Sequence, residues 1–273
     1  MTSSILIATD GSEAAGAAER FGAELAARLK ARVVGVCVVE DRFARGMPED
    51  GLGVAPPPAE PMAGYLRARG EATCRRLAER ATTAGVECVT EVLQGIADDR
   101  IVERGQKTDL IVVGRDGQHA AHRTGLIGST VSGVIRKTAK SALVVPSGAR
   151  LSGPVVLAFD GSAGSRLGAN LAVQIATRLG DPLNVFVDSK DKGRAIARFE
   201  EIRGLAGAAP VPVREISSTL GRPDVKIVDS AREVRAGLVV MGAYGRNRIT
   251  DYFLGSNSAA VVRTSPVAVL LAR

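Results

Sequence analysis

Apolar residues follow two different spacings along this chain. Short unbroken runs of Val, Ile and Leu are typical of buried parallel strands, and longer stretches with apolar positions every three or four residues are typical of helices. In residues 1–150 these patterns predict strands at Ser4 to Ala8, Arg32 to Val39, Val86 to Val92, Leu110 to Gly114 and Ser141 to Val145, with helices near 13–29, 65–84, 97–106 and 129–138. In residues 151–273 they predict strands near 155–159, 183–187, 211–216, 238–241 and 267–271, with helices near 163–179, 190–206, 222–235 and 256–263.

The two halves repeat one another. The segment Ile5-Leu-Ile-Ala-Thr-Asp10-Gly11-Ser12 recurs 150 positions later as Val155-Val-Leu-Ala-Phe-Asp160-Gly161-Ser162. Strand and helix alternate in both halves, which indicates a parallel sheet with helices on both faces. We therefore predict an α/β protein of two tandem flavodoxin-like (Rossmann-like) domains, residues 1–150 and 151–273, each with a five-stranded sheet.

A long insertion distinguishes the first half from the second. Asp10 and Gly114 are 104 positions apart, whereas Asp160 and Gly242 are 82 apart, and most of the excess lies in residues 42–63. The run of three prolines there predicts a surface loop with polyproline character. A solvated connector is the simpler interpretation, and a lid or partner-binding segment is the alternative.

The charge of the chain narrows the choice of partner without naming one. Its 36 Lys and Arg against 29 Asp and Glu give a net charge of +7, divided as +2 in residues 1–150 and +5 in residues 151–273. A basic chain attracts polyanions. The absence of Trp and an aromatic content of only 3% argue against a base-stacking surface for nucleic acid.

The remaining composition favours a cytoplasmic protein. There is no run of eighteen apolar residues and no basic leader in residues 1–8, so neither membrane spanning nor secretion is expected. The cysteines are three, an odd number without the close spacing of a zinc site, which fits a reducing compartment better than a disulfide framework.

Spaced glycines in the second half carry the most specific chemistry. Gly242 and Gly245 follow a predicted strand, and Gly255 precedes Ser256 at the start of a predicted helix. Glycine allows a ligand to approach the backbone, and the free N–H groups of a helix start attract anions. With Asp160 at the end of a neighbouring strand as a hydrogen-bond acceptor, these residues predict a nucleotide pocket.

This motif and the repeat resemble the universal stress protein family in its tandem form, over nearly the whole chain. Gly242, Gly245, Gly255 and Ser256 match the family's adenine-nucleotide signature of glycine, two residues, glycine, nine residues, glycine and Ser or Thr. The resemblance implies that the backbone of Val187 meets the adenine and that Met241 packs beside it. The implied site of the second half comprises Ala158, Asp160, Val187, Met241, Gly242, Gly245, Arg246, Gly255, Ser256 and Asn257.

The first half departs from this signature by one residue. Ten residues, not nine, separate Gly117 from Gly128, so the second half is the firmer prediction and binding in the first stays open. The implied first site comprises Ala8, Asp10, Val38, Val113, Gly114, Gly117, Gly128, Ser129 and Thr130. Arg115, His119 and Arg123 are further candidates to meet phosphates.

Simpler explanations exist for most of these residues. Asp10 and Asp160 in Asp-Gly-Ser sequences suit a turn and a helix cap, and Ser129 and Ser256 suit caps alone. His119 and His122 lack acidic or cysteine companions at metal-binding spacing, so a metal pair is not expected. No P-loop, dinucleotide fingerprint or nucleophile elbow is present, which leaves standard phosphohydrolase, dehydrogenase and esterase mechanisms without support.

We expect a stress-response protein that binds ATP, with Mg²⁺ as a candidate companion ion, and acts through occupancy with at most slow hydrolysis, as the resemblance implies. Its predicted partners are an adenine nucleotide and an unidentified protein. The two domains are expected to form an internal pseudo-dimer through strands 141–145 and 267–271, and a homodimer is a further option. The rivals are a nucleotide-free tandem scaffold, an ATP-consuming enzyme and, last, a nucleic-acid binder.

Overall fold

The computed structural model describes residues 2–40, 59–117, 127–207, 209–219, 221–244 and 254–273. In the first half these residues form β1 (Ser4–Ala8), α1 (Glu13–Leu29), β2 (Arg32–Val39), α3 (Ala59–Thr83), β3 (Cys88–Gln94), α4 (Ala97–Gly105), β4 (Leu110–Gly114), α5 (Ser129–Lys137) and β5 (Ser141–Val145). In the second half they form β6 (Val155–Ala158), α6 (Ala163–Leu179), β7 (Leu183–Asp188), α7 (Lys192–Ala206), β8 (Val213–Ser218), α8 (Pro223–Glu233), β9 (Leu238–Gly242), α9 (Ser256–Thr264) and β10 (Ala268–Ala272).

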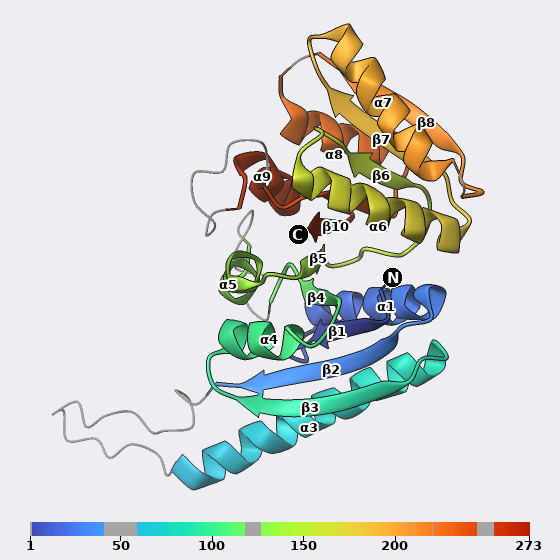
Figure 1. Cartoon of the computed structure of the whole chain (residues 1–273). Helices are drawn as coiled ribbons and strands as arrows, with labels where there is room; N and C mark the ends of the chain where they lie inside the picture. Colours follow the sequence, from blue (N-terminus) through green and yellow to red (C-terminus); the bar gives the residue numbers. More distant parts are fainter. Residues whose placement is uncertain (1, 41–58, 118–126, 208, 220, 245–253) are drawn as a thin grey trace, which may run out of the picture.

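The two half-sheets join edge to edge. Within the described part of the chain, ten strands form one sheet in the order β3-β2-β1-β4-β5-β10-β9-β6-β7-β8, which runs from one end of the molecule to the other (Figure 1). Neighbouring strands are parallel within each half, and β5 and β10 pair antiparallel at the junction with Leu143 opposite Leu270. The predicted α/β class and the predicted meeting of the last strands are therefore confirmed, with one continuous sheet in place of two separate ones.

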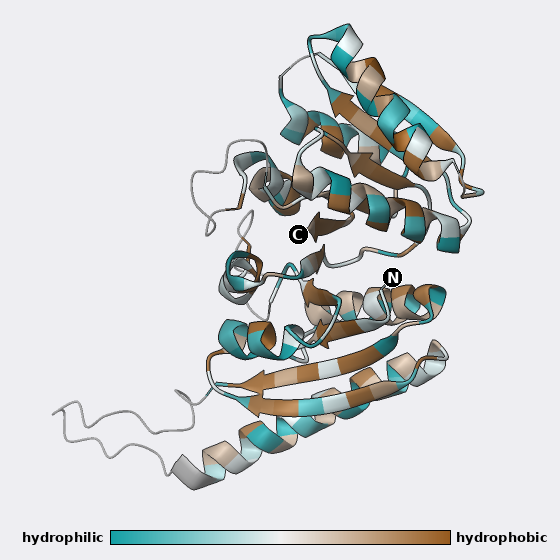
Figure 2. Cartoon of the chain, in the orientation of Figure 1, coloured by the Kyte–Doolittle hydropathy of each residue, from teal (hydrophilic) through white to brown (hydrophobic). Residues whose placement is uncertain are grey.

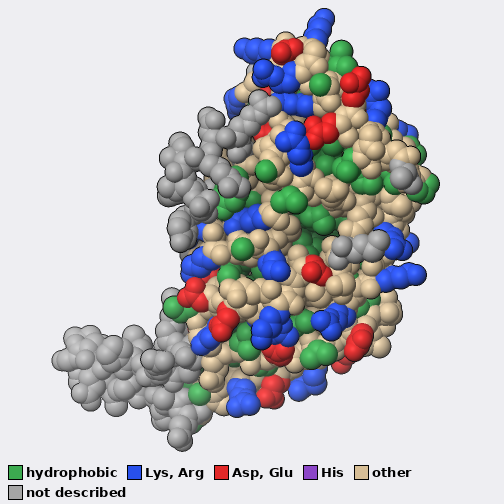
Figure 3. Space-filling model, viewed as in Figure 1, with side chains coloured by type: hydrophobic (Ala, Val, Ile, Leu, Met, Phe, Trp, Pro, Cys, Tyr) green, Lys and Arg blue, Asp and Glu red, His purple; other side chains and the backbone are tan. Residues whose placement is uncertain are grey.

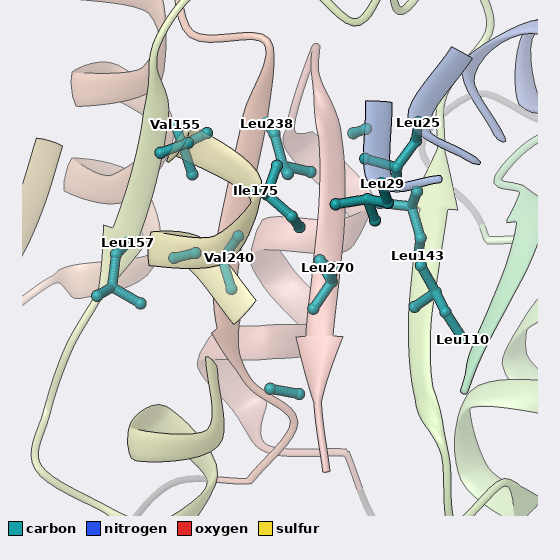
Figure 4. Packing of buried hydrophobic residues seen from close by; sticks show 14 of the residues in the cluster. Leu25, Leu29, Leu110, Leu143, Val155, Leu157, Ile175, Leu238, Val240 and Leu270 are labelled. Carbon is teal, nitrogen blue, oxygen red and sulfur yellow. The ribbon is translucent and has the colours of Figure 1, made fainter. Parts of the chain in front are cut away.

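Helices cover both faces of this sheet. Apolar side chains of α1, α3, α6 and α7 pack on one face, and those of α4, α5, α8 and α9 pack on the other. The inner strands are apolar along most of their length, whereas the edge strands β3 and β8 and the helices mix apolar and polar residues (Figure 2). Leu25 and Leu29 of α1 lie beside the junction of β5 and β10, so the first face is one core shared by both halves (Figure 4).

The observed element boundaries differ most from the predicted ones around α3. This helix begins at Ala59, so the last residues of the predicted loop 42–63 are helical, and residues 42–58 lie outside the described part of the chain. The strand after it begins at Cys88 instead of Val86, because Val86 N–H still donates to the Ala81 carbonyl in the closing turn of α3. In the described residues no helix is both long and apolar enough to cross a bilayer.

Candidate functional site

The turn after the first strand of each half is built identically. Asp160 Oδ1 accepts a hydrogen bond from Ser162 N–H at 2.9 Å, and Ser162 Oγ accepts one from the N–H three residues later, which caps α6. Gly161 has a φ of 75°, a conformation that favours glycine. Asp10, Gly11 and Ser12 form the same turn and cap α1. The turn and cap chemistry expected of Asp-Gly-Ser is thus present, and both aspartates also line a cavity.

The start of α9 forms an anion cradle at the end of β9. Gly255 precedes the helix and makes no side-chain cap, so the first N–H groups of α9 are available to a ligand. Ser258 Oγ donates to the Gly242 carbonyl at 3.0 Å and holds the helix start against the strand. A Cβ on Gly242 would lie 2.9 Å from the backbone nitrogen of Ser165, so this close approach requires glycine.

A cavity of about 480 Å³ joins these features in the second half. It lies at the carboxyl ends of β6, β7 and β9, where ligands of doubly wound sheets bind. The predicted residues that line it are Ala158, Asp160, Met241, Gly242, Gly255, Ser256 and Asn257. Gly245 and Arg246 lie outside the described residues, so their predicted roles stay predictions.

On the second strand of this half, β7, the residues that line the cavity are not the predicted one. Val187 does not line the cavity, because its side chain is fully buried in the core on the opposite face of the sheet. Phe186 and Asp188, which flank it, line the cavity instead. Strand register makes Asp188 the counterpart of Val38, since Leu183 pairs with Val155 as Val33 pairs with Ile5. The implied contact between the Val187 backbone and adenine stays a prediction. The repeat has an offset of 150 residues, so the position that corresponds to Val38 is Asp188.

The first half contains a matching cavity of about 390 Å³. All nine predicted residues line it: Ala8, Asp10, Val38, Val113, Gly114, Gly117, Gly128, Ser129 and Thr130. The start of α5 at Gly128 likewise has no side-chain cap. Sequence reasoning missed Arg69 and Thr73, which also line this cavity, because it could not place α3 over the strand ends. It also missed Cys37, the neighbour of Val38 on β2.

Two of the cavity side chains have displaced pKa values. Burial raises the pKa of the Cys37 thiol to about 12, so it is protonated at neutral pH. Burial would raise the pKa of Asp116, but hydrogen bonds from Arg115 and Ser147 outweigh it and hold this pKa below its usual value. Asp116 is therefore a carboxylate at neutral pH, fixed by neighbours within its own domain.

An arginine from each half caps the C-terminal end of the last helix of the other half. Arg115 Nη1 donates to the Ser265 carbonyl at 2.7 Å and to the Arg263 carbonyl at 3.4 Å, at the end of α9. Reciprocally, the Arg273 guanidinium donates to the carbonyls of Ile135 and Thr138, at the end of α5. Both cradle helices therefore begin at their own cavity and end at a side chain of the other domain.

Basic and acidic side chains are interspersed over the face of the molecule in Figure 3. No group of three or more His, Cys, Asp or Glu side chains could hold a metal ion anywhere in the described ranges. His119, His122 and Arg123 fall in the segment that these ranges leave out.

Two doubly wound half-sheets define a tandem α/β protein. Each half has an aspartate after its first strand, a helix start without a side-chain cap after its fourth, and a cavity at the strand ends. This chain belongs to the universal stress protein family. The family's model matches it twice, over residues 1–146 and 152–273, which confirms the tandem resemblance.

Relatives match along most of the chain. Universal stress protein Slr1230 of Synechocystis is 26% identical over 293 aligned positions, which cover 98% of this chain and 99% of that protein. Universal stress protein Rv2005c of Mycobacterium tuberculosis is 28% identical over 194 positions, 63% of this chain and 64% of that protein. The crystal structure of a universal stress protein from Archaeoglobus fulgidus has a TM-score of 0.78 at 19% identity, covers 99% of this chain and 98% of that one, and shows the same fold.

Proposed function

We propose that this protein binds ATP in each of its two cavities and acts through occupancy. The observation that carries the proposal is the alignment of three features across adjacent strands. In the second half, the start of α9 lies beside β9, Asp160 follows β6, and the end of β7 comes next in the sheet. Neighbouring strands are about 4.8 Å apart, so the row spans about 10 Å.

This row suits the parts of a nucleoside phosphate in order. The uncapped helix start accepts phosphates, the carboxylate accepts hydrogen bonds from ribose hydroxyls, and the apolar side chains near the next strand receive the base. In the first half the same row runs from the start of α5 through Asp10 to Val38. Both cavities lie within the 300–1,000 Å³ range typical of small-molecule sites.

Any hydrolysis in this proposal is slow. The sequence contains no P-loop, dinucleotide fingerprint or nucleophile elbow that would support rapid turnover. Mg²⁺ would arrive with the phosphates, neutralising their charge, because this ion is usually held by phosphate oxygens together with one or two carboxylates. Nucleotide binding would alter the ends of α5 and α9, where each helix contacts the opposite domain. A protein partner would recognise the altered surface there.

Paired charge substitutions test the proposal. Ser129→Glu and Ser256→Glu each place a carboxylate at one exposed cradle start, where it competes with phosphate while remaining favourable for the helix. Asn170→Glu, at an exposed position of α6 away from both cradles, is the matched control. Isothermal titration of nucleotide-free full-length protein with Mg-ATP should show two sites, of which Ser129→Glu and Ser256→Glu each weaken one at least roughly tenfold, whereas Asn170→Glu leaves both unchanged.

The alternative is a scaffold whose glycine loops are purely structural. In that case neither ATP nor GTP would bind or raise the melting temperature of the wild-type protein, and both cradle variants would behave like Asn170→Glu. Such a result would overturn the proposed function.

A further inference from the structure

We propose that the two cavities are coupled, so that a nucleotide in one strengthens binding in the other, and that Arg115 and Arg273 transmit the effect. The inference rests on the nucleotide binding proposed above and adds how the two sites regulate each other. It follows from one position of the glycine motif, its third residue, which is Asp116 in the first half and Tyr244 in the second. In both halves this residue lines the cavity of its own domain.

In the first half the link runs through Arg115. Its guanidinium pairs with the cavity residue Asp116, with 3.2 Å between Nε and Oδ1, and its Nη1 donates to the Ser265 carbonyl at the end of α9. Its backbone carbonyl accepts a hydrogen bond from the Gly128 N–H, at the start of α5, at 3.3 Å. One residue thus connects the start of the cradle helix in its own domain with the end of the cradle helix in the other.

In the second half the link runs through Arg273. Its guanidinium lies 4.7 Å from the centre of the Tyr244 ring and donates to two carbonyls at the end of α5. The Gly255 N–H, at the start of α9, donates at 3.2 Å to the carbonyl of Ala243, the residue before Tyr244. Both links therefore have the same form, in which a cavity residue contacts an arginine and this arginine caps the opposite cradle helix.

The cradle helices are short enough for one end to influence the other. α5 and α9 pack on the same face of the sheet, on either side of the junction between β5 and β10 (Figure 1). Each has nine residues, so its ends are about 14 Å apart. A helix of this length is marginal by itself and depends on the groups that satisfy its ends. A cap at the last turn therefore also helps to order the first turn, where the phosphates bind.

The coupling through these contacts is positive. Tyr244 is partly exposed in the wall of the second cavity, so a nucleotide there reduces its freedom, fixes Arg273 against it and so orders the end of α5. The start of α5 is then ordered before a phosphate arrives, and the nucleotide in the first cavity loses less conformational entropy on binding. The effect is reciprocal, because by thermodynamic linkage each ligand strengthens the other by the same factor.

The test measures this coupling factor by titration calorimetry of full-length, nucleotide-free protein with Mg-ATP. Ser129→Leu and Ser256→Leu, both at exposed positions, each close one cradle by bulk without the negative charge that would imitate a bound phosphate. They give the association constant of each cavity while the other is empty, and the wild type gives the overall constant for filling both. The overall constant divided by the product of the two single-site constants is the coupling factor, which should be at least roughly fivefold.

Arginine variants test whether the assigned links carry the coupling. Arg115→Ala and Arg273→Ala, each combined with the same leucine substitutions, should bring the factor close to one, whereas a purely structural role would lower all the constants and leave the factor unchanged. Arg263→Ala, which removes an exposed arginine from the last turn of α9, is the matched control and should leave the factor at its wild-type value. Arg273→Lys keeps the charge without the planar fork and should lower the factor at least about twofold, and it replaces Arg273→Ala if that variant does not fold.

The outcomes separate this inference from the proposed function. If both cavities bind ATP in the wild type and the factor is one or less, the nucleotide sites stand and the coupling is wrong. If the factor exceeds one and stays unchanged in both arginine variants, the assignment of the two arginines is wrong. If the wild type binds ATP in fewer than two sites, the inference and the proposed function are overturned together.

Discussion

Replacing Arg273 by alanine removes a side chain that bridges the two halves. Its guanidinium donates to the carbonyls of Ile135 and Thr138 at the end of α5 and lies 4.7 Å from the centre of the Tyr244 ring. Burial lowers the pKa of this guanidinium below its usual value, although it remains charged at neutral pH. The carbonyls that it satisfies are among the last of a helix and have no intrahelical partner.

The expected loss of unfolding free energy is about 3 kcal/mol. Hydrogen bonds that involve a charged group contribute ~1.5–3 kcal/mol each, and a partly desolvated cation–π contact contributes ~1 kcal/mol. These contributions do not add in full, because water reaches part of the site and ordering a long side chain costs entropy. Arg273→Lys keeps the charge without the planar fork and should lose about half as much.

Urea unfolding followed by circular dichroism measures these losses. Arg263→Ala is the control, since it removes an exposed arginine from the last turn of α9 and should cost no more than about 0.5 kcal/mol. If Arg273→Ala and Arg263→Ala lose the same free energy, the bridging contacts contribute nothing measurable and the argument fails.

Three further outcomes follow from buried or paired groups. Cys37, whose pKa is about 12, should react with iodoacetamide at pH 8 roughly a hundredfold more slowly in the folded protein than in urea, and equal rates by mass spectrometry would contradict its burial. Glu19→Gln should lower the unfolding free energy by about 2 kcal/mol, because the buried Glu19 loses its charge-assisted pairing with the partly exposed Arg76 and Arg80; a loss under about 0.5 kcal/mol in urea unfolding would contradict this. A hydrogen bond from Arg104 lowers the pKa of Glu91, so this pair stabilises the protein above the ordinary glutamate pKa and its contribution is lost as pH falls through the lowered one. The difference in urea stability between wild type and Glu91→Gln should therefore be up to about 1 kcal/mol at pH 7 and shrink below pH 4; a constant difference would refute the sign.

Local patterns of apolar and turn residues were sufficient to predict most of the fold. The unbroken apolar runs located every strand to within two residues, because a strand buried on both faces tolerates few polar side chains. Asp10 and Asp160 were found through their turn sequence, and Gly242 and Gly255 through their spacing, since both signals are contained in short stretches of chain. The start of α3 at Ala59 was missed because the prolines before it masked the helical spacing.

Residues distant in sequence escaped prediction where packing alone brings them to a site. Nothing in the spacing around Arg198 indicates that it reaches the cavity, because this depends on how α7 crosses the strand ends. The second-strand residue was placed at Val187 through a resemblance to a valine, whereas strand register gives the cavity position to Asp188.

The sequence by itself determined that this protein has two similar α/β halves with an aspartate and a glycine-flanked helix start in each. Those features depend on residues close together in the chain, and the repeat states them twice. Only the tertiary structure decided that the halves share one sheet, that an arginine from each caps the end of the cradle helix of the other, and that Asp188 instead of Val187 lines the second cavity. These properties depend on which strands become neighbours and which way each side chain faces, and long-range packing fixes both.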